Sequence, residues 1–558
     1  MIYSMPWVGF GLDISFRFDH FSVFISCSIA AFALLIALYS LVFMSGRKSA
    51  GLFYIYLILT VLFAIGAVLA NNLILLLFFW EGLLLTLFGM IYIGRKEAAK
   101  TAIKAFIIIG ITDLLMMLGI AITGHLAGTF TLSQISLPLG GLSSLAFILL
   151  MIGAIAKSGS MPFHSWIPDA AVDAPLPFMA LIPGAFEKLI GIYFLTRISL
   201  DLFKLNPGSW LSTLLMIIGA ITIILAVMMA LIQKDYKRLL SYHAISQVGY
   251  MILGIGTMVP VGIVGGLFHM INNALYKSCL FLSGGSVEKQ TGTTDLSKLG
   301  GLAVKMPITA VCFLVAAVSI SGVPPFNGFF SKELVYDGAL ERGWIFYLAA
   351  VAGSFFTAAS FLKLSHAAFL GKLENSNKNV KEASWPMLVP MIIIAAVCVL
   401  FGIYNALPLN YLIQPILGER LEGHGFAGLP SNYLLVLITI LVLIGAYLNH
   451  SYGVKKTGKG LGAADHIHYA PALSGLYDKA EKRYFDPYDI GMKISEWFSI
   501  LLYRIDRFVD WIYEIFIVNV TYALTQSLRW LHSGNFSNYV IWSIIGALAI
   551  AILMVLKI

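Results

Sequence analysis

Runs of about 20 apolar residues follow one another along most of the chain, and this pattern limits the fold more than any other feature of the sequence. A helix needs about 20 such residues to cross the hydrocarbon core of a bilayer. Hydrophobic residues make up 59% of the 558 positions and charged residues only 11%, which exceeds what a water-soluble core requires. The sequence therefore predicts an all-α polytopic membrane protein with about 14 transmembrane helices.

The predicted crossings alternate with loops of contrasting charge. Lysine and arginine gather in every second loop, for example in residues 45–51, 94–100 and 234–238. Because such loops stay on the cytoplasmic side, both termini are expected to face outward, and the net charge of +8 indicates topology rather than nucleic-acid binding. The predicted crossings are residues 21–44, 52–70, 72–93, 103–124, 143–170, 176–198, 211–232, 239–258, 261–283, 307–340, 346–370, 387–407, 432–450 and 538–556.

Two groups of five predicted helices, residues 52–198 and 211–370, have the same internal order. In each group the fourth helix is interrupted, at SGSMPF (158–163) and at SGVPPF (321–326). Since five is an odd number, the second group must lie inverted relative to the first, as in many ion transporters. The other segments are an N-terminal segment with the first crossing (1–51), two further crossings (387–450), a lateral amphipathic helix (479–535) and a C-terminal anchor (538–558).

Lys157 ends the apolar run that precedes the first interruption. The residues from Ser158 to Pro162 cannot continue a regular helix, because proline lacks the amide hydrogen and clashes with the preceding turn. Backbone groups freed in this way have to face protein or water instead of lipid, and interrupted helices of this kind form ion sites in transporters. The alternative is a lysine near a helix end whose amine reaches the membrane surface.

Ionisable residues recur inside the apolar runs, where each is costly enough to be a functional candidate. His243 and Tyr250 share one helix face by their spacing, and His269 and Lys277 share another. For each residue alone, the alternative is a structural ion pair or polar contact between helices. Together they form the string of protonatable groups that proton conduction through a membrane requires. The candidates are Glu81, Asp113, Lys157, Glu187, Lys188, His243, His269, Lys277, Lys332 and Glu333.

Five stretches carry a resemblance to a known family: FFWEGLLLTLF, KSGSMPFHSWIPDA, KDYKRLLSYHAISQVGYM, FHMINNALYKSCLFLSGG and GFFSKEL. They resemble, in the family order, the antiporter-like proton-pumping subunits of respiratory complex I, energy-converting membrane hydrogenases and Mrp-type cation/proton antiporters. The resemblance implies that the buried helix glutamate is Glu81, the broken-helix lysines are Lys157 and Lys332, the central-axis lysine is Lys277, the channel histidine is His269 and an acidic position is Asp113.

The chain departs from the family pattern at several positions. Pro183 stands in place of a histidine, in a stretch that also introduces Glu187 and Lys188. Asn273 replaces a second histidine, and Gly110 replaces an arginine. The chain also begins at a segment that the family usually reaches after two further helices. These features resemble the membrane subunits of energy-converting hydrogenases more than those of NADH-linked complex I.

The C-terminal part resembles the large distal, L-type, subunit of the family through the stretch YDKAEKRYFDPYDIGMKISEWF. Residues 492–531 are amphipathic, with Asp506, Asp510 and Glu514 spaced along one face. The resemblance implies a lateral helix that lies along neighbouring subunits, with a length of roughly 60 Å at 1.5 Å per residue. The alternative is a pair of interfacial helices folded onto this chain.

Three functions agree with these features. The first is a subunit that moves H⁺ or Na⁺ in a redox-driven complex, either an energy-converting hydrogenase or a complex I-like assembly. The second is a subunit of an Mrp-type Na⁺/H⁺ antiporter, and the third is a membrane partner for inorganic-carbon uptake. In each case the chain is expected in a prokaryotic cytoplasmic membrane, beside other antiporter-like and connecting subunits.

No cofactor or metal is expected in this chain itself. The four cysteines, Cys27, Cys279, Cys312 and Cys398, are scattered through apolar helices without metal-site spacing. The nickel–iron and iron–sulfur centres of a redox-driven complex are therefore expected in its peripheral redox subunits.

Two acid–lysine pairs are predicted to switch protons in two half-channels. Glu81 and Lys157 lie at membrane depth in helices that are two apart, so the carboxylate can hold the lysine charged and its separation can release the proton. Lys332 and Glu333 are adjacent just past the second interruption and are expected to form the corresponding pair.

Overall fold

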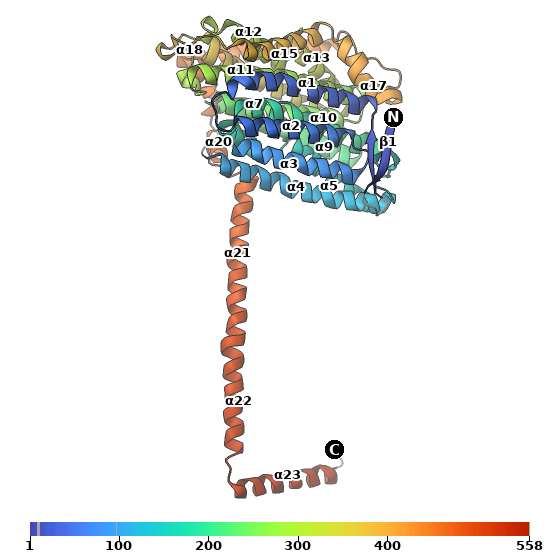
Figure 1. Cartoon of the computed structure of the whole chain (residues 1–558), viewed down its shortest axis with the longest axis vertical. Coiled ribbons are helices and arrows are strands. Elements are labelled where there is room, and N and C mark those ends of the chain that lie inside the picture. The colour runs from blue at the N-terminus through green and yellow to red at the C-terminus, as the bar shows by residue number, and fades with distance from the viewer. Residues whose placement is uncertain (8–11, 96, 472, 557–558) are drawn as a thin grey trace. The chain divides into compact units, whose positions relative to one another are not determined.

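The computed structural model describes residues 1–7, 12–95, 97–471 and 473–556 (Figure 1). The chain divides into two units, Met1–Arg483 and Tyr484–Ile558. The first unit is a bundle of helices that contains all of the candidate residues named above, and the second is built from helices alone.

The first unit begins with a feature that an all-α prediction omits. Strands β1 (Ile2–Trp7) and β2 (Leu12–Arg17) pair antiparallel, with Ile2 opposite Arg17 and Trp7 opposite Leu12. The β2 stretch LDISFR alternates apolar and polar residues, the period that favours a strand. This alternation is the signal that the helix-based interpretation of residues 1–51 missed.

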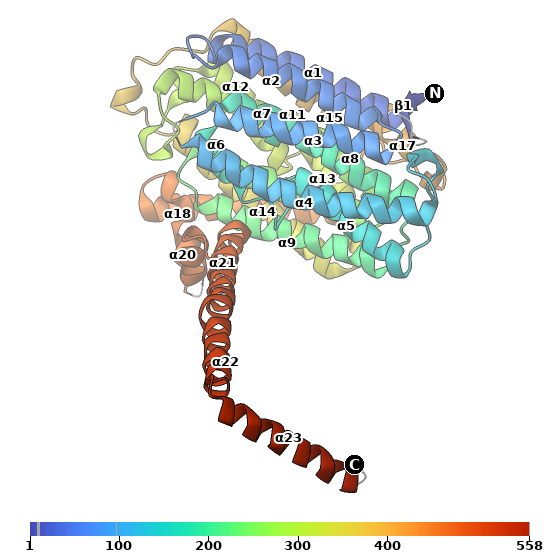
Figure 2. The same cartoon turned by 60° about the horizontal axis from the view of Figure 1, so that its bottom comes forward.

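The next helices follow one another side by side in chain order (Figures 1 and 2). Asp19 caps the first of them by accepting a hydrogen bond from the Ser22 amide, and Asn72 caps the third through the amides of Ile74 and Leu75. These helices are α1 (His20–Phe43), α2 (Ala50–Leu69), α3 (Leu73–Tyr92), α4 (Ala98–Ala127) and α5 (Gly141–Lys157).

Beyond α5 the first unit continues with short helical segments and with longer helices. The short segments are α6 (Trp166–Asp173), α7 (Leu176–Leu181), the π-helical turn η2 (Ile182–Phe186), α8 (Glu187–Thr196) and the π-helical turn η3 (Arg197–Leu202). The longer helices are α9 (Trp210–Ile232), α10 (Tyr236–Gly256), α11 (Pro260–Thr291), α12 (Pro307–Ser321), α13 (Asn327–Arg342), α14 (Trp344–Ser365) with the π-helical turn η6 (His366–Leu370), α15 (Trp385–Ile403) and α18 (Tyr433–Thr457).

Short helical segments fill the remaining connections of the first unit. They are η1 (Leu132–Gln134), η4 (Leu296–Lys298), η5 (Leu302–Val304), η7 (Asn375–Asn377), α16 (Ala406–Pro408), η8 (Leu409–Ile413), α17 (Gln414–Leu417), η9 (Gly418–Leu421), η10 (Leu461–Ala464), α19 (Asp465–His468) and α20 (Leu473–Glu481).

Both predicted interruptions are confirmed. The helix α5 ends at Lys157 and α6 begins at Trp166, while α12 ends at Ser321 and α13 begins at Asn327. In each interruption a glycine adopts a left-handed backbone, Gly159 with φ +79° and Gly322 with φ +77°. Glycine takes this conformation without the steric cost of a Cβ atom, so it ends the helix cleanly.

In the described part of the chain, 11 helices are long and apolar enough to cross a membrane. The segment Pro487–Leu531, predicted to lie laterally, is one of them by length and composition. The predicted crossings outside this set are the two interrupted helices and α10 and α11, whose polar side chains lower their mean hydropathy. The structure therefore supports a multi-pass helical membrane protein, and the count of 14 crossings stays a prediction.

The second unit is dominated by one long helix. The helices α21 (Pro487–Trp511) and α22 (Ile517–Leu531) are joined by the π-helical turn η11 (Ile512–Phe516) into 45 continuous residues, and α23 (Phe536–Leu556) follows. Within the long helix, Arg507 forms ion pairs with Asp510 at 2.7 Å and with Asp506 at 3.2 Å. The predicted amphipathic stretch is thus helical throughout.

Candidate ion pathway

The Lys157 amine lies at the C-terminal end of α5, where carbonyl groups favour a positive charge. Only 4% of the residue is exposed. Its Nζ atom lies 3.7 Å from Oδ2 of Asp113 on α4, donates to the Trp80 carbonyl at 3.4 Å, and lies 4.8 Å from the centre of the Trp80 ring. The Trp80 indole also donates to Oδ1 of Asp113 at 2.9 Å. The lysine, the acid and the indole therefore form one closed cluster.

The sequence predicts an ion pair between Lys157 and Glu81. In the structure the carboxylate partner of Lys157 is instead Asp113. Trp80 and Glu81 are neighbours on α3, so their side chains point about 100° apart around the helix. Trp80 faces Lys157, whereas Glu81 is only half-buried and forms no ion pair with it within 4 Å in the described structure.

A second ion pair lies against the first interruption. Glu187 and Lys188 begin α8, and Nζ of Lys188 lies 3.3 Å from Oε2 of Glu187 with both residues buried. A Cβ atom on Gly159 would lie 3.4 Å from the Lys188 amine. Pro183, which cannot donate a backbone hydrogen bond, sits in the π-helical turn just before the pair.

The centre of the unit is formed by α10, α11 and α14. Lys277 on α11 is fully buried, donates to the Leu240 carbonyl at 3.1 Å and lies 5.6 Å from the Phe361 ring centre. His243 on α10 shares a 2.8 Å hydrogen bond with Ser360 on α14. The lysine and the histidine are thus both buried, on two helices that pack against each other.

His269 links the centre to the second interruption. One ring nitrogen lies 3.0 Å from Ser331 on α13, and the other lies 3.1 Å from Gln247 on α10 and 3.3 Å from the Tyr276 hydroxyl. Asn273 lies one turn further along α11, and its amide nitrogen and oxygen are both buried without a hydrogen-bond partner in the described structure. Unpaired buried polar atoms of this kind are where internal water molecules bind.

In the described part of the chain, Lys332 on α13 has neutral partners only. Its amine donates to the Ile320 carbonyl at 2.8 Å and to the Ser354 hydroxyl at 3.0 Å, and it lies 5.1 Å from the Tyr250 ring centre. Glu333 instead accepts a 2.5 Å hydrogen bond from Thr439 on α18. The expected Lys332–Glu333 pair does not form within 4 Å in the described structure, because the amine and the carboxylate each bind groups on other helices.

Eight buried ionisable residues on α4, α5, α8, α10, α11 and α13 are together called the buried charged row. Glu81 and Glu333 lie beside the row and not in it. The row consists of Asp113, Lys157, Glu187, Lys188, Lys277, His243, His269 and Lys332.

One buried lysine was missed by sequence reasoning. Lys363, near the end of α14, is 2% exposed and donates to the carbonyls of Leu231 and Gln233. These carbonyls end α9, where the helix dipole favours a cation. The signal was available, because Lys363 stands inside the predicted crossing 346–370.

An ion network also surrounds α6, the short helix that follows the first interruption. Asp169 on α6 pairs with Lys104 on α4 at 3.0 Å, and with Arg483 at 2.7 Å. Thr101 donates to Asp173 on the same short helix. The carboxylates of α6 are thus bound to α4 and to the end of the first unit.

Residues 70–357 match the family described as "NADH:quinone oxidoreductase/Mrp antiporter, TM". The curated relatives include a "Na(+)/H(+) antiporter subunit A1" of Staphylococcus haemolyticus (strain JCSC1435), which is 32% identical over 491 residues. A protein with the same description from Staphylococcus aureus (strain MRSA252) is 31% identical over 493 residues. Each alignment covers 81% of this chain but only 60% and 61% of the relatives, so the chain spans about three fifths of their length.

Two solved structures share the fold. A chain of the Mrp complex from Dietzia sp. DQ12-45-1b has a TM-score of 0.68 at 21% identity, over 79% of this chain and 89% of that chain. A chain of the membrane-bound sulfane sulfur reductase, an archaeal respiratory membrane complex, has a TM-score of 0.68 at 23% identity, over 100% and 92% of the two chains. With more than half of its residues matched by the family, this chain belongs to the NADH:quinone oxidoreductase/Mrp antiporter family of membrane subunits.

Proposed function

We propose that this chain is an ion-translocating subunit of a multisubunit membrane complex, and that it carries protons in exchange for Na⁺. The observation that carries the proposal is the buried charged row, in which six helices contribute eight buried ionisable side chains. Ionisable groups are costly inside a membrane protein, so buried ones are candidates for an ion pathway. Glu81 and Glu333 are proposed to act on this row from the side.

The magnitudes agree with such a role. Two unit charges about 4 Å apart interact by roughly 4 kcal/mol at an effective dielectric constant near 20. Moving one charge across a potential of 100 mV requires about 2.3 kcal/mol. Separating Lys157 from Asp113 therefore changes the energy of the lysine charge by an amount comparable to the driving force.

Secondary Na⁺/H⁺ antiport is the form of this function that we favour over a redox-driven pump. The curated relatives are Na⁺/H⁺ antiporter subunits by their descriptions, and the described helices align with a chain of an Mrp complex. The corresponding partners are other antiporter-like membrane subunits in a prokaryotic cytoplasmic membrane. The likeness is to bacterial relatives, which supports that location.

A redox-driven complex is the second candidate, and one observation favours it. The likeness to the sulfane sulfur reductase subunit extends over 100% of this chain, including the second unit, whereas that to the Mrp subunit covers 79%. In this case the partner subunits hold the redox centres.

The two inverted repeats, the fourteen crossings and the lateral position of residues 479–535 belong to the same proposal. The two interruptions with left-handed glycines support the repeats, and the 45-residue helix supports the lateral element. A chain ending at Arg483 tests the lateral position of the long helix. We expect it to assemble without at least one partner subunit when the complex is purified, and full subunit retention would contradict a lateral role.

The function is tested in inside-out membrane vesicles that hold the intact complex. A pH gradient formed by ATP hydrolysis is monitored with a fluorescent dye, and Na⁺ is added without any electron donor. Antiport predicts that Na⁺ collapses the gradient, and that Lys157→Met abolishes this response whereas the exposed-site variant Lys100→Met keeps it. A response that requires an electron donor would favour the redox-driven candidate, and a normal response of Lys157→Met would contradict the role of the row.

A further inference from the structure

A small cavity lies at one end of the first unit, close to the buried charged row but outside it. Its volume is about 10 Å³, which is room for about one water molecule. Arg17, Arg197 and Asp201 line its polar side, and Leu76, Tyr193 and Phe194 are among the residues of its apolar side. The loop turn at Asn71 and the short helix η1 adjoin it, and the charge of the loops assigns this end to the outer side.

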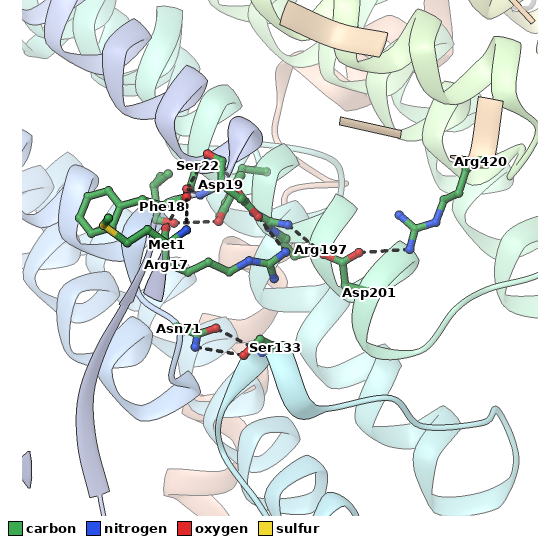
Figure 3. A network of polar contacts seen from close by, with 12 residues as sticks. Met1, Arg17, Phe18, Asp19, Ser22, Asn71, Ser133, Arg197, Asp201 and Arg420 are labelled. Carbon is green, nitrogen blue, oxygen red and sulfur yellow. Dashed lines mark hydrogen bonds and ion pairs between the residues drawn. The ribbon is translucent and has the colours of Figure 1, made fainter. Parts of the chain in front are cut away.

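An ion network closes the polar side of the cavity (Figure 3). Arg197 donates to both carboxylate oxygens of Asp19 at 2.6 and 2.7 Å and to Asp201 at 2.9 Å. Arg17 pairs with Asp19 at 2.8 Å, and Arg420 pairs with Asp201 at 3.3 Å. Three arginines face two aspartates, so one positive charge remains in excess. The network joins Asp19, which caps α1, to Arg197 and Asp201 in the π-helical turn η3 that follows α8.

The guanidinium of Arg197 also lies beside two aromatic rings that contact each other. Its central carbon is 5.1 Å from the Phe21 ring centre and 5.0 Å from the Tyr193 ring centre, and the two ring centres are 4.7 Å apart. The contacts with these rings and three carboxylate hydrogen bonds hold this side chain in one orientation. The polar wall of the cavity is therefore pre-organised and not a set of mobile surface charges.

The inner wall connects the cavity to the row through two aromatic residues. Phe194 lines the cavity and contacts the Trp80 ring edge-on, with the ring centres 5.4 Å apart. Trp80 in turn holds Asp113 and Lys157 through the contacts described above. The contacts of Phe194 and Trp80 thus connect the cavity wall to the first ion pair of the row.

We propose that this cavity is the outer port through which the Lys157–Asp113 pair exchanges protons with water, and that the Phe194–Trp80 contact is its closed barrier. This inference rests on the proposed function. It adds the route by which the Lys157–Asp113 pair reaches outer water, and it names H⁺ as the ion that takes this route. Protons pass along a single water molecule, whereas Na⁺ with its hydration shell does not fit a cavity of about 10 Å³.

The port is tested by thiol labelling of the intact complex with hydrogen peroxide, which needs no transport activity. In a Cys27→Ser background, Leu76→Cys places a thiol in the cavity wall, and Leu75→Cys places one at the neighbouring position that does not line it. Leu76 and Leu75 are 2% and 3% exposed, so surface accessibility alone does not separate them. Hydrogen peroxide is close to water in size, and we expect it to oxidise Leu76→Cys several times faster than Leu75→Cys. Equal rates would overturn the port.

The barrier is tested by the passive decay of a pH gradient in vesicles that contain the same complex. We expect Phe194→Ala to speed the decay severalfold and Ile192→Ala, a buried change on the same helix away from the cavity, to leave it near that of the unmodified complex. Equal decay in an assembled Phe194→Ala complex would remove the barrier, and if that variant does not assemble, the labelling result alone decides. An inactive Lys157→Met complex with an unlabelled cavity overturns the port but not the proposed function. Normal exchange by Lys157→Met overturns the function, whatever the labelling shows.

Discussion

Lys157 and Lys332 each lie beside an interrupted helix, but in the described structure only Lys157 has a carboxylate within 4 Å. Lys157 ends a helix, and its amine lies 3.7 Å from the carboxylate of Asp113. Lys332 lies in the first half of α13, past its interruption, and its amine has a carbonyl, a hydroxyl and the face of an aromatic ring. Helix-end carbonyls favour both charges, because the Ile320 carbonyl that binds Lys332 lies near the C-terminal end of α12. One interruption thus holds its lysine in a charge pair, and the other leaves its lysine to neutral dipoles.

The largest effect is expected from Asp113→Asn. Removing one member of a buried ion pair typically costs 3–5 kcal/mol, about the cost of an unpaired buried charge. We expect this variant to lose ion exchange and to melt at a lower temperature, as measured by the thermal unfolding of the purified complex. The double variant with Lys157→Met should recover stability but not transport. An Asp113→Asn complex with unmodified stability would show that the Lys157–Asp113 ion pair does not stabilise the fold.

Lys332→Met should abolish exchange with a smaller loss of stability. It leaves neutral acceptors behind instead of a charge, and an unsatisfied neutral group costs about 1–3 kcal/mol. Thermal unfolding and Na⁺-dependent exchange are measured on the same preparation as for Asp113→Asn. The contrast between the two lysine sites breaks down if Lys332→Met destabilises the complex as much as Asp113→Asn does.

Glu81→Gln and Glu333→Gln should have the smallest effects. Glu81 has no ion pair with Lys157 in the described structure, and Glu333 binds Thr439 and not Lys332. We expect each variant to keep a larger share of the exchange rate than Asp113→Asn keeps. If Glu81→Gln is as inactive as Asp113→Asn, Lys157 exchanges partners during the transport cycle and the static pairing seen here is one of two states.

The sequence predicts the interruptions and the buried acids and lysines, because glycine, proline and charge stand out within apolar runs. It does not predict which side chains meet. The choice between Asp113 and Glu81 depends on the rotation of α3, and a shift of one residue turns a helix face by about 100°. The pairing of β1 with β2 was missed because a short alternating stretch before a long helix carries a weak signal. Lys363 was missed although it is a charge inside an apolar run.

The most direct test of the buried charged row is the exchange rate of the intact complex with Lys277→Met. This lysine is fully buried at the centre of the row, between the two interruptions, and the exposed-site variant Lys289→Met on the same helix is its control. In inside-out vesicles with equal amounts of assembled complex, Lys277→Met should show no Na⁺-dependent collapse of the pH gradient, while Lys289→Met responds as the unmodified complex does. A collapse at the unmodified rate in Lys277→Met would contradict the account.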